Sequence, residues 1–126
     1  MTDKVRVLVT GSRTWEDVHA IYWAFRNWWE EAGQPDQPLL ISGACPRGAD
    51  AHAEYVWERN GWPVHRVPAD WNRYGRSAGF RRNEEMVLMR PDILFAFIHN
   101  NSNGASHTLR LAEKHGIPTI VHRYES

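Results

Sequence analysis

The chain has 126 residues, which is the size of one compact domain, and its 15 lysines and arginines balance its 15 aspartates and glutamates. A net charge of zero provides no overall positive field, which argues against nucleic acid and anionic membranes as partners. One cysteine, Cys45, excludes an intramolecular disulfide and a thiolate metal cluster within one chain. The first apolar run is too short for a signal sequence or a membrane span. We therefore expect a single cytoplasmic domain over residues 1–126, with no metal site and no cofactor.

Five short apolar and β-branched runs are the candidate strands. They cover residues 5–10, 39–42, 63–67, 93–98 and 119–122. Segments of helix length separate them, and this alternation is typical of βαβ units with parallel strands.

The candidate helices lie between these runs. After the first run, large apolar residues recur every three or four positions and predict a helix that ends near Gly33. These residues are Trp15, Val18, Tyr22, Phe25 and Trp29. Further helices are expected over 49–60, 77–89 and 105–115. The stretch 68–76 shows no periodic pattern, so we expect an irregular loop with a functional role.

These elements predict an α/β fold, a single Rossmann-like domain of three layers around a five-stranded, mostly parallel sheet. Right-handed crossovers favour the strand order 3-2-1-4-5, with a ligand crevice between the first and fourth strands at their carboxyl ends. The seven tryptophans are many for this length. We expect some to fill the core and others to form a homo-oligomer contact on helix surfaces.

The first polar motif, Thr10-Gly11-Ser12-Arg13, follows the first strand. Gly11 lets the backbone approach a phosphate, and Ser12 and Arg13 can donate hydrogen bonds to it. A plain βα turn with a capping hydroxyl explains the motif equally well.

The second motif runs from Ser42 through Gly43 and Gly48 to Asp50. Its two glycines precede a helix N-terminus, an arrangement that can hold an anion. Asp50 lies in the first helical turn, where it either complements the helix dipole or accepts a hydrogen bond from a ribose hydroxyl. Cys45 has no histidine near it in sequence, which argues against a nucleophile.

The third motif, residues 68–83, alternates four arginines with aromatic residues. Guanidinium groups suit phosphate and aromatic faces suit a base, whereas the structural alternative pairs these arginines with Asp70, Glu84 and Glu85. The fourth motif, residues 100–108, forms another glycine turn before a helix. Of the seven histidines we place only His107 near the ligand, and a surface role explains its position equally well.

Taken in order, these motifs resemble the YspA/cpYpsA-related branch of the SLOG superfamily. The resemblance covers almost the whole chain and continues through Pro91-Asp92, Ala96-Phe97 and Gly116-Ile117-Pro118. It implies a Rossmann-like domain of bacteria and phages, related to the Lonely Guy phosphoribohydrolases and to molybdenum-cofactor carrier-like proteins. The partner it implies is a nucleotide-derived small molecule.

The resemblance and the motifs together give the expected ligand-binding residues. They are Gly11, Ser12, Arg13, Ser42, Gly43, Gly48, Asp50, Arg82, Asn83, Gly104, Ala105 and Ser106. The first hypothesis is a sensor, carrier or sequestering protein for a nucleotide or a nucleotide-derived phosphate.

An enzyme is the second hypothesis, an N-glycosidase or phosphoribohydrolase acting on a nucleoside monophosphate. Lonely Guy enzymes carry a catalytic glutamate in PGGxGTxxE, and Thr108 occupies that position here. The candidate catalytic carboxylates are therefore Asp70 and Glu84. A third hypothesis, single-stranded nucleic acid binding, rests on the arginine-aromatic segment and on a related fold in a DNA-processing protein.

Overall fold

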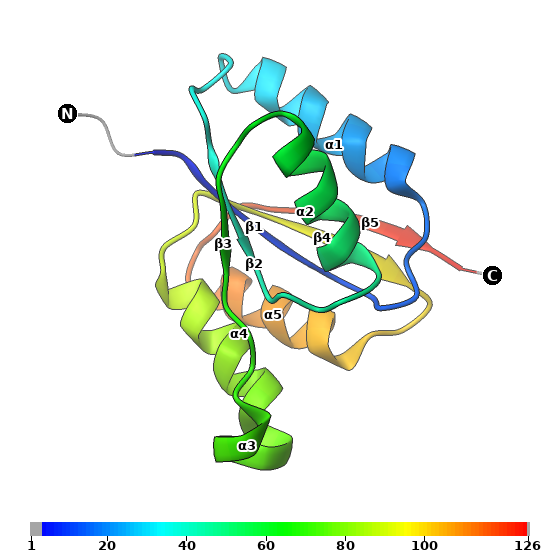
Figure 1. Ribbon diagram of the computed structural model, residues 1–126, viewed down its shortest axis with the longest axis vertical. Coiled ribbons are helices and arrows are strands. Elements are labelled where there is room, and N and C mark those ends of the chain that lie inside the picture. The colour runs from blue at the N-terminus through cyan, green and yellow to red at the C-terminus, as the bar shows by residue number, and fades with distance from the viewer. Residues whose placement is uncertain (1–3, 126) are drawn as a thin grey trace.

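The structure is a computed structural model that describes residues 4–125. Figure 1 shows a sheet with helices on both faces. In chain order the elements are β1 (Arg6–Gly11), α1 (Val18–Glu31), β2 (Leu39–Ser42), α2 (Ala49–Arg59), β3 (Val64–Arg66), α3 (Trp71–Tyr74), the 3-10 turn η1 (Gly75–Ser77), α4 (Ala78–Leu88), β4 (Ile93–His99), α5 (Asn103–Lys114) and β5 (Thr119–Tyr124).

The sheet has the strand order β3-β2-β1-β4-β5, and all of its neighbouring strands are parallel. The predicted fold class and strand order are thus confirmed, and the sheet is parallel throughout. The register of β1 on β4 pairs Thr10 with Ala96 and Gly11 with Phe97, so both strands end at the same edge. The chain reverses its direction of winding here, because β1 lies between β2 and β4.

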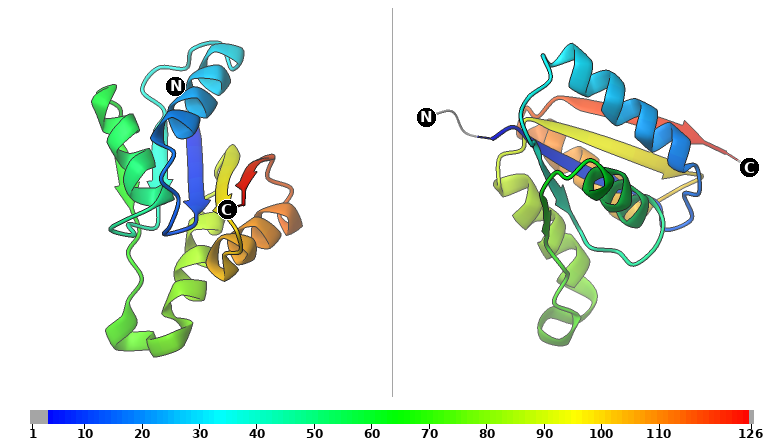
Figure 2. Two further views of the ribbon diagram at one scale, coloured as in Figure 1. Left: turned by 90° about the vertical axis from the view of Figure 1, so that its right-hand side faces the viewer. Right: turned by 45° about the horizontal axis from the view of Figure 1, so that its top comes forward.

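Two apolar layers hold the helices on the sheet. Side chains alternate along β1, so Val7 and Val9 face the layer with Phe25 and Trp57, whereas Leu8 faces the layer with Met86 and Leu109. Helices α1 and α2 therefore cover one face and α4 and α5 cover the other, as Figure 2 shows.

Most of the tryptophans belong to the layer under α1 and α2. Trp15 and Trp57 are buried, and Trp28, Trp29 and Trp62 are half-buried around them. The rings of Trp57 and Trp62 meet edge to face at 5.1 Å between centroids. The two remaining tryptophans, Trp23 and Trp71, are more than half exposed.

Two elements differ from the sequence prediction. Helix α1 begins at Val18, because the Asp17 carboxylate accepts a hydrogen bond from the Ala20 N–H and so caps the helix there. The segment predicted to be irregular contains α3 and η1, and Asp70 caps α3 by accepting a hydrogen bond from the Arg73 N–H. Helix α3 packs on η1 and α4, and Figure 1 shows that these elements extend below the sheet as an arm. We refer to residues 71–82 as the arm.

No helix within residues 4–125 is both long and apolar enough to cross a membrane.

Candidate functional site

A cleft of about 380 Å³ lies at the carboxyl ends of β1 and β4, where the strand order reverses. The loops after β1 and β2, the first turns of α5 and the inner side of α4 form its walls. The residues that line it are Val9, Thr10, Gly11, Ser12, Arg13, Thr14, Gly43, Cys45, Asp50, Arg82, Asn83, Met86, Asn101, Ser102, Gly104 and Ala105.

Gly11 and Ser12 join the end of β1 to its neighbours. A Cβ atom on Gly11 would collide with the Ala49 side chain and the Phe97 carbonyl, so close packing already requires a glycine here. The Ser12 hydroxyl donates to the His99 carbonyl at 3.3 Å and accepts from the His99 N–H at 2.9 Å. Its backbone N–H donates to the Phe97 carbonyl. The polar groups of Ser12 therefore connect β1 to β4.

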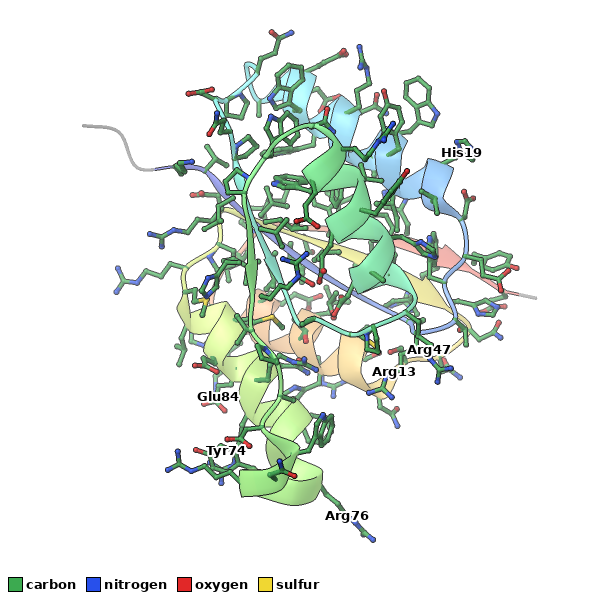
Figure 3. The ribbon with its side chains drawn as sticks, viewed as in Figure 1. Arg13, His19, Arg47, Tyr74, Arg76 and Glu84 are labelled. Carbon is green, nitrogen blue, oxygen red and sulfur yellow. The ribbon has the colours of Figure 1, made fainter. Side chains whose placement is uncertain are left out.

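Arg13 is the first residue of this loop whose side chain is exposed. It makes no hydrogen bond or ion pair with any residue between 4 and 125. A Cβ atom on Gly48 would collide with the Arg13 backbone, so the loops after β1 and β2 touch at this point. Figure 3 shows the side chains of Arg13 and Arg47 at this end of the molecule. The loops after β1 and β2 thus each carry an exposed arginine at this end of the molecule, and Arg13 also lines the cleft.

Ser42 and Gly48 shape the loop after β2 from outside the cleft lining. The buried Ser42 hydroxyl donates to a Glu54 carboxylate oxygen at 2.6 Å and accepts from the Ala44 N–H at 3.2 Å. Gly48 has a φ of 76°, a conformation that glycine adopts without strain, and it precedes the first residue of α2. Both residues therefore position the loop and do not face the cleft.

Asp50 is the buried carboxylate of the cleft. Burial raises the pKa of Asp50 from 3.8 to about 6, although the hydrogen bond from the Cys45 N–H and the charge of Arg82 oppose the increase. Gly43 makes room for this pair, because a Cβ atom there would lie 2.7 Å from Arg82 Nη1 and 3.0 Å from Asp50 Oδ2. The first turn of α2 thus places a titratable carboxyl beside a guanidinium group.

Arg82 and Asn83 reach the cleft from α4. Arg82 Nη1 donates to the Gly43 carbonyl, and its Nε donates to Asn83 Oδ1 at 2.9 Å. Burial lowers the pKa of Arg82, and the Asp50 carboxylate counteracts that effect. The buried Asn83 donates to the Gly104 carbonyl at 3.3 Å and lies 3.3 Å from Nδ1 of His107. The side chain of Asn83 therefore connects α4 to the start of α5.

The start of α5 forms the far wall. The Ser102 hydroxyl caps the helix by accepting from the Ala105 N–H at 3.2 Å. Gly104 is exposed, and its Cβ position has open space around it. Ser106 follows one position after the last lining residue, Ala105. The Thr108 hydroxyl is buried and donates to the Gly104 carbonyl, so this position supplies no charged group to the cleft.

The two carboxylates proposed for catalysis lie outside the cleft lining. Asp70 is exposed and caps α3, and Glu84 is exposed on α4, where Figure 3 shows it on the side away from Arg13. Burial lowers the pKa of His107, and nearby Arg110 lowers it further while Glu84 opposes the shift. Asp50 is therefore the carboxylate that lines the cleft.

Several residues that line the cleft were not among the site residues predicted from the sequence. Thr14 contributes a hydroxyl that lies 2.7 Å from Nδ1 of His99, and Asn101 and Ser102 approach from the loop after β4. Met86 forms part of the floor. The fourth motif, residues 100–108, includes Asn101 and Ser102. Their position just before a predicted helix is the sequence feature that could have identified them. Within residues 4–125, no three His, Cys, Asp or Glu side chains group closely enough to hold a metal ion.

Comparison with known proteins supports the assignment that the motifs suggested. Residues 5–74 match the model of the YspA, cpYpsA-related SLOG family, a range that includes the loops after β1 and β2. The chain is also 38% identical over 122 residues to the Gene 61 protein of Mycobacterium phage D29, covering 91% of this chain and 94% of the phage protein. No solved structure matches the chain. The chain belongs to the YspA, cpYpsA-related SLOG family.

Proposed function

We propose that residues 1–126 form one nucleotide-binding domain whose cleft takes the phosphate of a nucleotide or nucleotide-derived ligand. The observation that carries the proposal is the pair of arginines that line the cleft from two different elements, Arg13 on the β1 loop and Arg82 on α4. A phosphate between them would accept charge-assisted hydrogen bonds from both guanidinium groups. Family membership supports the same ligand class.

The hydrogen bonds of these arginines leave donors for a ligand. Arg13 has no hydrogen-bonding partner in the described chain, so all five of its N–H groups are available. Arg82 uses Nε and one N–H of Nη1, which leaves three. Asp50 offsets part of the positive charge without pairing with Arg13. The cleft is therefore suited to an anion.

The start of α5 adds a favourable field. Its N-terminus carries the positive end of the helix dipole, and exposed Gly104 leaves room for a group to approach the backbone. Phosphates bind helix N-termini in other α/β proteins for the same reason. A sensor, carrier or sequestering protein requires no more than these contacts.

A thermal-shift titration tests the proposal. Ligands that bind only the native state raise its Tm, so at least one of AMP, GMP, CMP, UMP and ADP-ribose should raise it at millimolar concentration. Arg13→Ala should weaken that binding about ten- to a hundredfold, because a charge-assisted contact is worth on the order of 1.5–3 kcal/mol. Arg26→Ala, which replaces an exposed arginine of α1 outside the cleft lining, serves as the control. No shift with any of these compounds would refute the proposal.

The buried carboxyl of Asp50 favours a second candidate, an N-glycosidase that acts on a nucleoside monophosphate. A carboxyl with a pKa of about 6 lining a cleft is suited to proton transfer near neutral pH. Chromatography after incubation with each monophosphate would detect released base. Base release by the wild type that is lost in Asp50→Asn would support this activity. If the wild type releases no base, this candidate is rejected and the binding function remains.

A further inference from the structure

A second hollow of about 180 Å³ adjoins the cleft and opens onto the arm. Arg13, Arg82, Asn83 and Gly104 line both cavities, so the two spaces adjoin. The remaining walls of the hollow come from the arm and are aromatic, basic or glycine. A ligand that occupies the cleft would therefore meet a different chemistry when it extends toward the arm.

Two exposed aromatic rings define this hollow. Trp71 on α3 is 52% exposed and Phe80 on α4 is 48% exposed, unlike the core aromatics of the other sheet face. Trp71 lies over Gly79, where a Cβ atom would be only 3.3 Å from the indole Cη2. Phe80 meets the His107 ring edge to face at 4.5 Å between centroids. Both rings are thus positioned by contacts within the protein while part of their surface stays accessible.

The arginines of the arm divide into two groups. Arg73 and Arg81 lie over the Tyr74 ring, at 5.1 and 4.4 Å from its centroid, and so stabilise the arm itself. Arg76 and Arg82 line the hollow, and Figure 3 shows Arg76 extending from the tip of the arm. None of these four makes an ion pair within residues 4–125, and no carboxylate lines the hollow. Charge and ring surface together favour an electron-rich planar group attached to an anion.

We propose that this hollow binds the base of the ligand, stacked on Trp71 and Phe80, while the attached phosphate lies between Arg13 and Arg82. The inference rests on the proposed function, and it adds that the ligand is a nucleotide recognised through its base. A sugar phosphate or a free polyphosphate would leave the aromatic surface uncovered. Stacking tolerates every base, because each has a π face, so the hollow recognises the class of ligand more strongly than the identity of the base.

Ligands with and without a base separate the contribution of the base to affinity from that of the phosphate. Isothermal titration should compare ribose 5-phosphate with AMP, GMP, CMP and UMP, which add only the base. At least one nucleotide should bind about five- to a hundredfold more tightly than ribose 5-phosphate, because this is the range that stacking of a base on an aromatic side chain contributes. The double variant Trp71→Ala/Phe80→Ala should remove this difference and leave ribose 5-phosphate within twofold of its original affinity.

Two controls test whether the rings act by stacking. The double variant Trp71→Phe/Phe80→Tyr keeps both ring faces and should restore most of the preference for the nucleotide. Trp23→Ala removes a tryptophan that is 55% exposed but lines neither cavity, and it should change no affinity.

The outcomes distinguish the two proposals. Binding of ribose 5-phosphate as tightly as every nucleotide would overturn the base site and leave the phosphate site standing. Equal loss of both ligand types in the alanine double variant would also overturn it, since the rings would then only maintain the arm. Failure of these five compounds and of ADP-ribose to bind would refute the proposed function, and the base site with it. Binding of a single-stranded oligonucleotide alone, with steep salt dependence, would assign the hollow to nucleic acid and overturn the inference.

Discussion

Ser12 and Arg13 are adjacent in the sequence, yet within residues 4–125 the side chain of Ser12 is hydrogen-bonded and that of Arg13 is unpaired. The buried Ser12 hydroxyl exchanges two hydrogen bonds with the His99 backbone, whereas Arg13 projects from the loop without a partner in the described chain. The same motif therefore contains a structural residue and a ligand-binding candidate.

Replacing Ser12 by alanine should consequently reduce stability. Loss of a buried, doubly hydrogen-bonded hydroxyl should lower the free energy of unfolding by about 1–2 kcal/mol. Chemical denaturation measures this as a lower midpoint at unchanged slope. Arg13→Ala should leave the midpoint unchanged in the same experiment. The reverse pattern would make Arg13 the structural residue of the loop.

Asp50 should make the stability of the protein depend on pH. Its folded pKa of about 6 exceeds the unfolded value of 3.8, so the folded state holds this proton more tightly than the unfolded state does. The resulting stabilisation is complete below pH 3.8 and is lost as the pH rises through about 6. Asp50→Asn carries no such titration. The variant should therefore gain on the order of 1–3 kcal/mol relative to the wild type between pH 4 and 7.

Denaturation of both proteins across this pH range gives the difference directly. A difference that stays constant with pH would show that the Asp50 pKa is not raised. A difference that grows in the opposite direction would mean that pairing with Arg82 outweighs burial.

Sequence reasoning could identify the residue types at the site but not how their polar groups are used. The positions of Arg13, Asp50 and Arg82 after strands and on a predicted helix pointed to the cleft, and each lines it. The partners of Ser12 and Ser42 are His99 and Glu54, which only the folded chain brings near them. Asp70 and Glu84 were proposed as catalytic residues because they are carboxylates near arginines in the sequence. In the structure, Asp70 caps α3 and Glu84 is exposed to solvent on α4.

At the scale of elements, the start of α5 supports a prediction that separates stability from binding. Beyond its own helix and its chain neighbours, no atom lies within 4 Å of a Cβ placed on Gly104. Alanine favours a helix over glycine by up to about 1 kcal/mol, so Gly104→Ala should leave the Tm unchanged or raise it. The affinity of the variant for a nucleoside monophosphate should fall several-fold, because the added methyl group occupies the cleft. Asn103→Ala, at the exposed first position of α5 and outside the cleft lining, is the matched control. Unchanged affinity in Gly104→Ala would place the phosphate away from α5.

The arm shows why one element escaped prediction. Helix α3 has four residues, too few to display a period of 3.6, and Asp70 caps it with a single hydrogen bond. The longer helices were predictable because their apolar faces repeat over three or more turns and end near glycine or proline. The start of α1 was predicted too early, since Trp15 is buried in the loop before the helix and still fits the helical spacing.

At the scale of the whole molecule, the strand order followed from the alternation of strands and helices together with the handedness of the crossovers. The distribution of the tryptophans did not follow from the sequence, because burial depends on which helix face meets the sheet. Five of the seven are buried or half-buried, which leaves Trp23 as the exposed tryptophan of a long helix. Self-association through helix surfaces stays a prediction and now concerns Trp23 together with exposed Tyr55.

A crystal structure of the protein with the tightest-binding nucleoside monophosphate tests the central claim most directly. Phosphate density should lie between the guanidinium groups of Arg13 and Arg82, close to the backbone of Gly104, with the base against Trp71 and Phe80. Phosphate density at any other surface, with the cleft empty, would contradict the account.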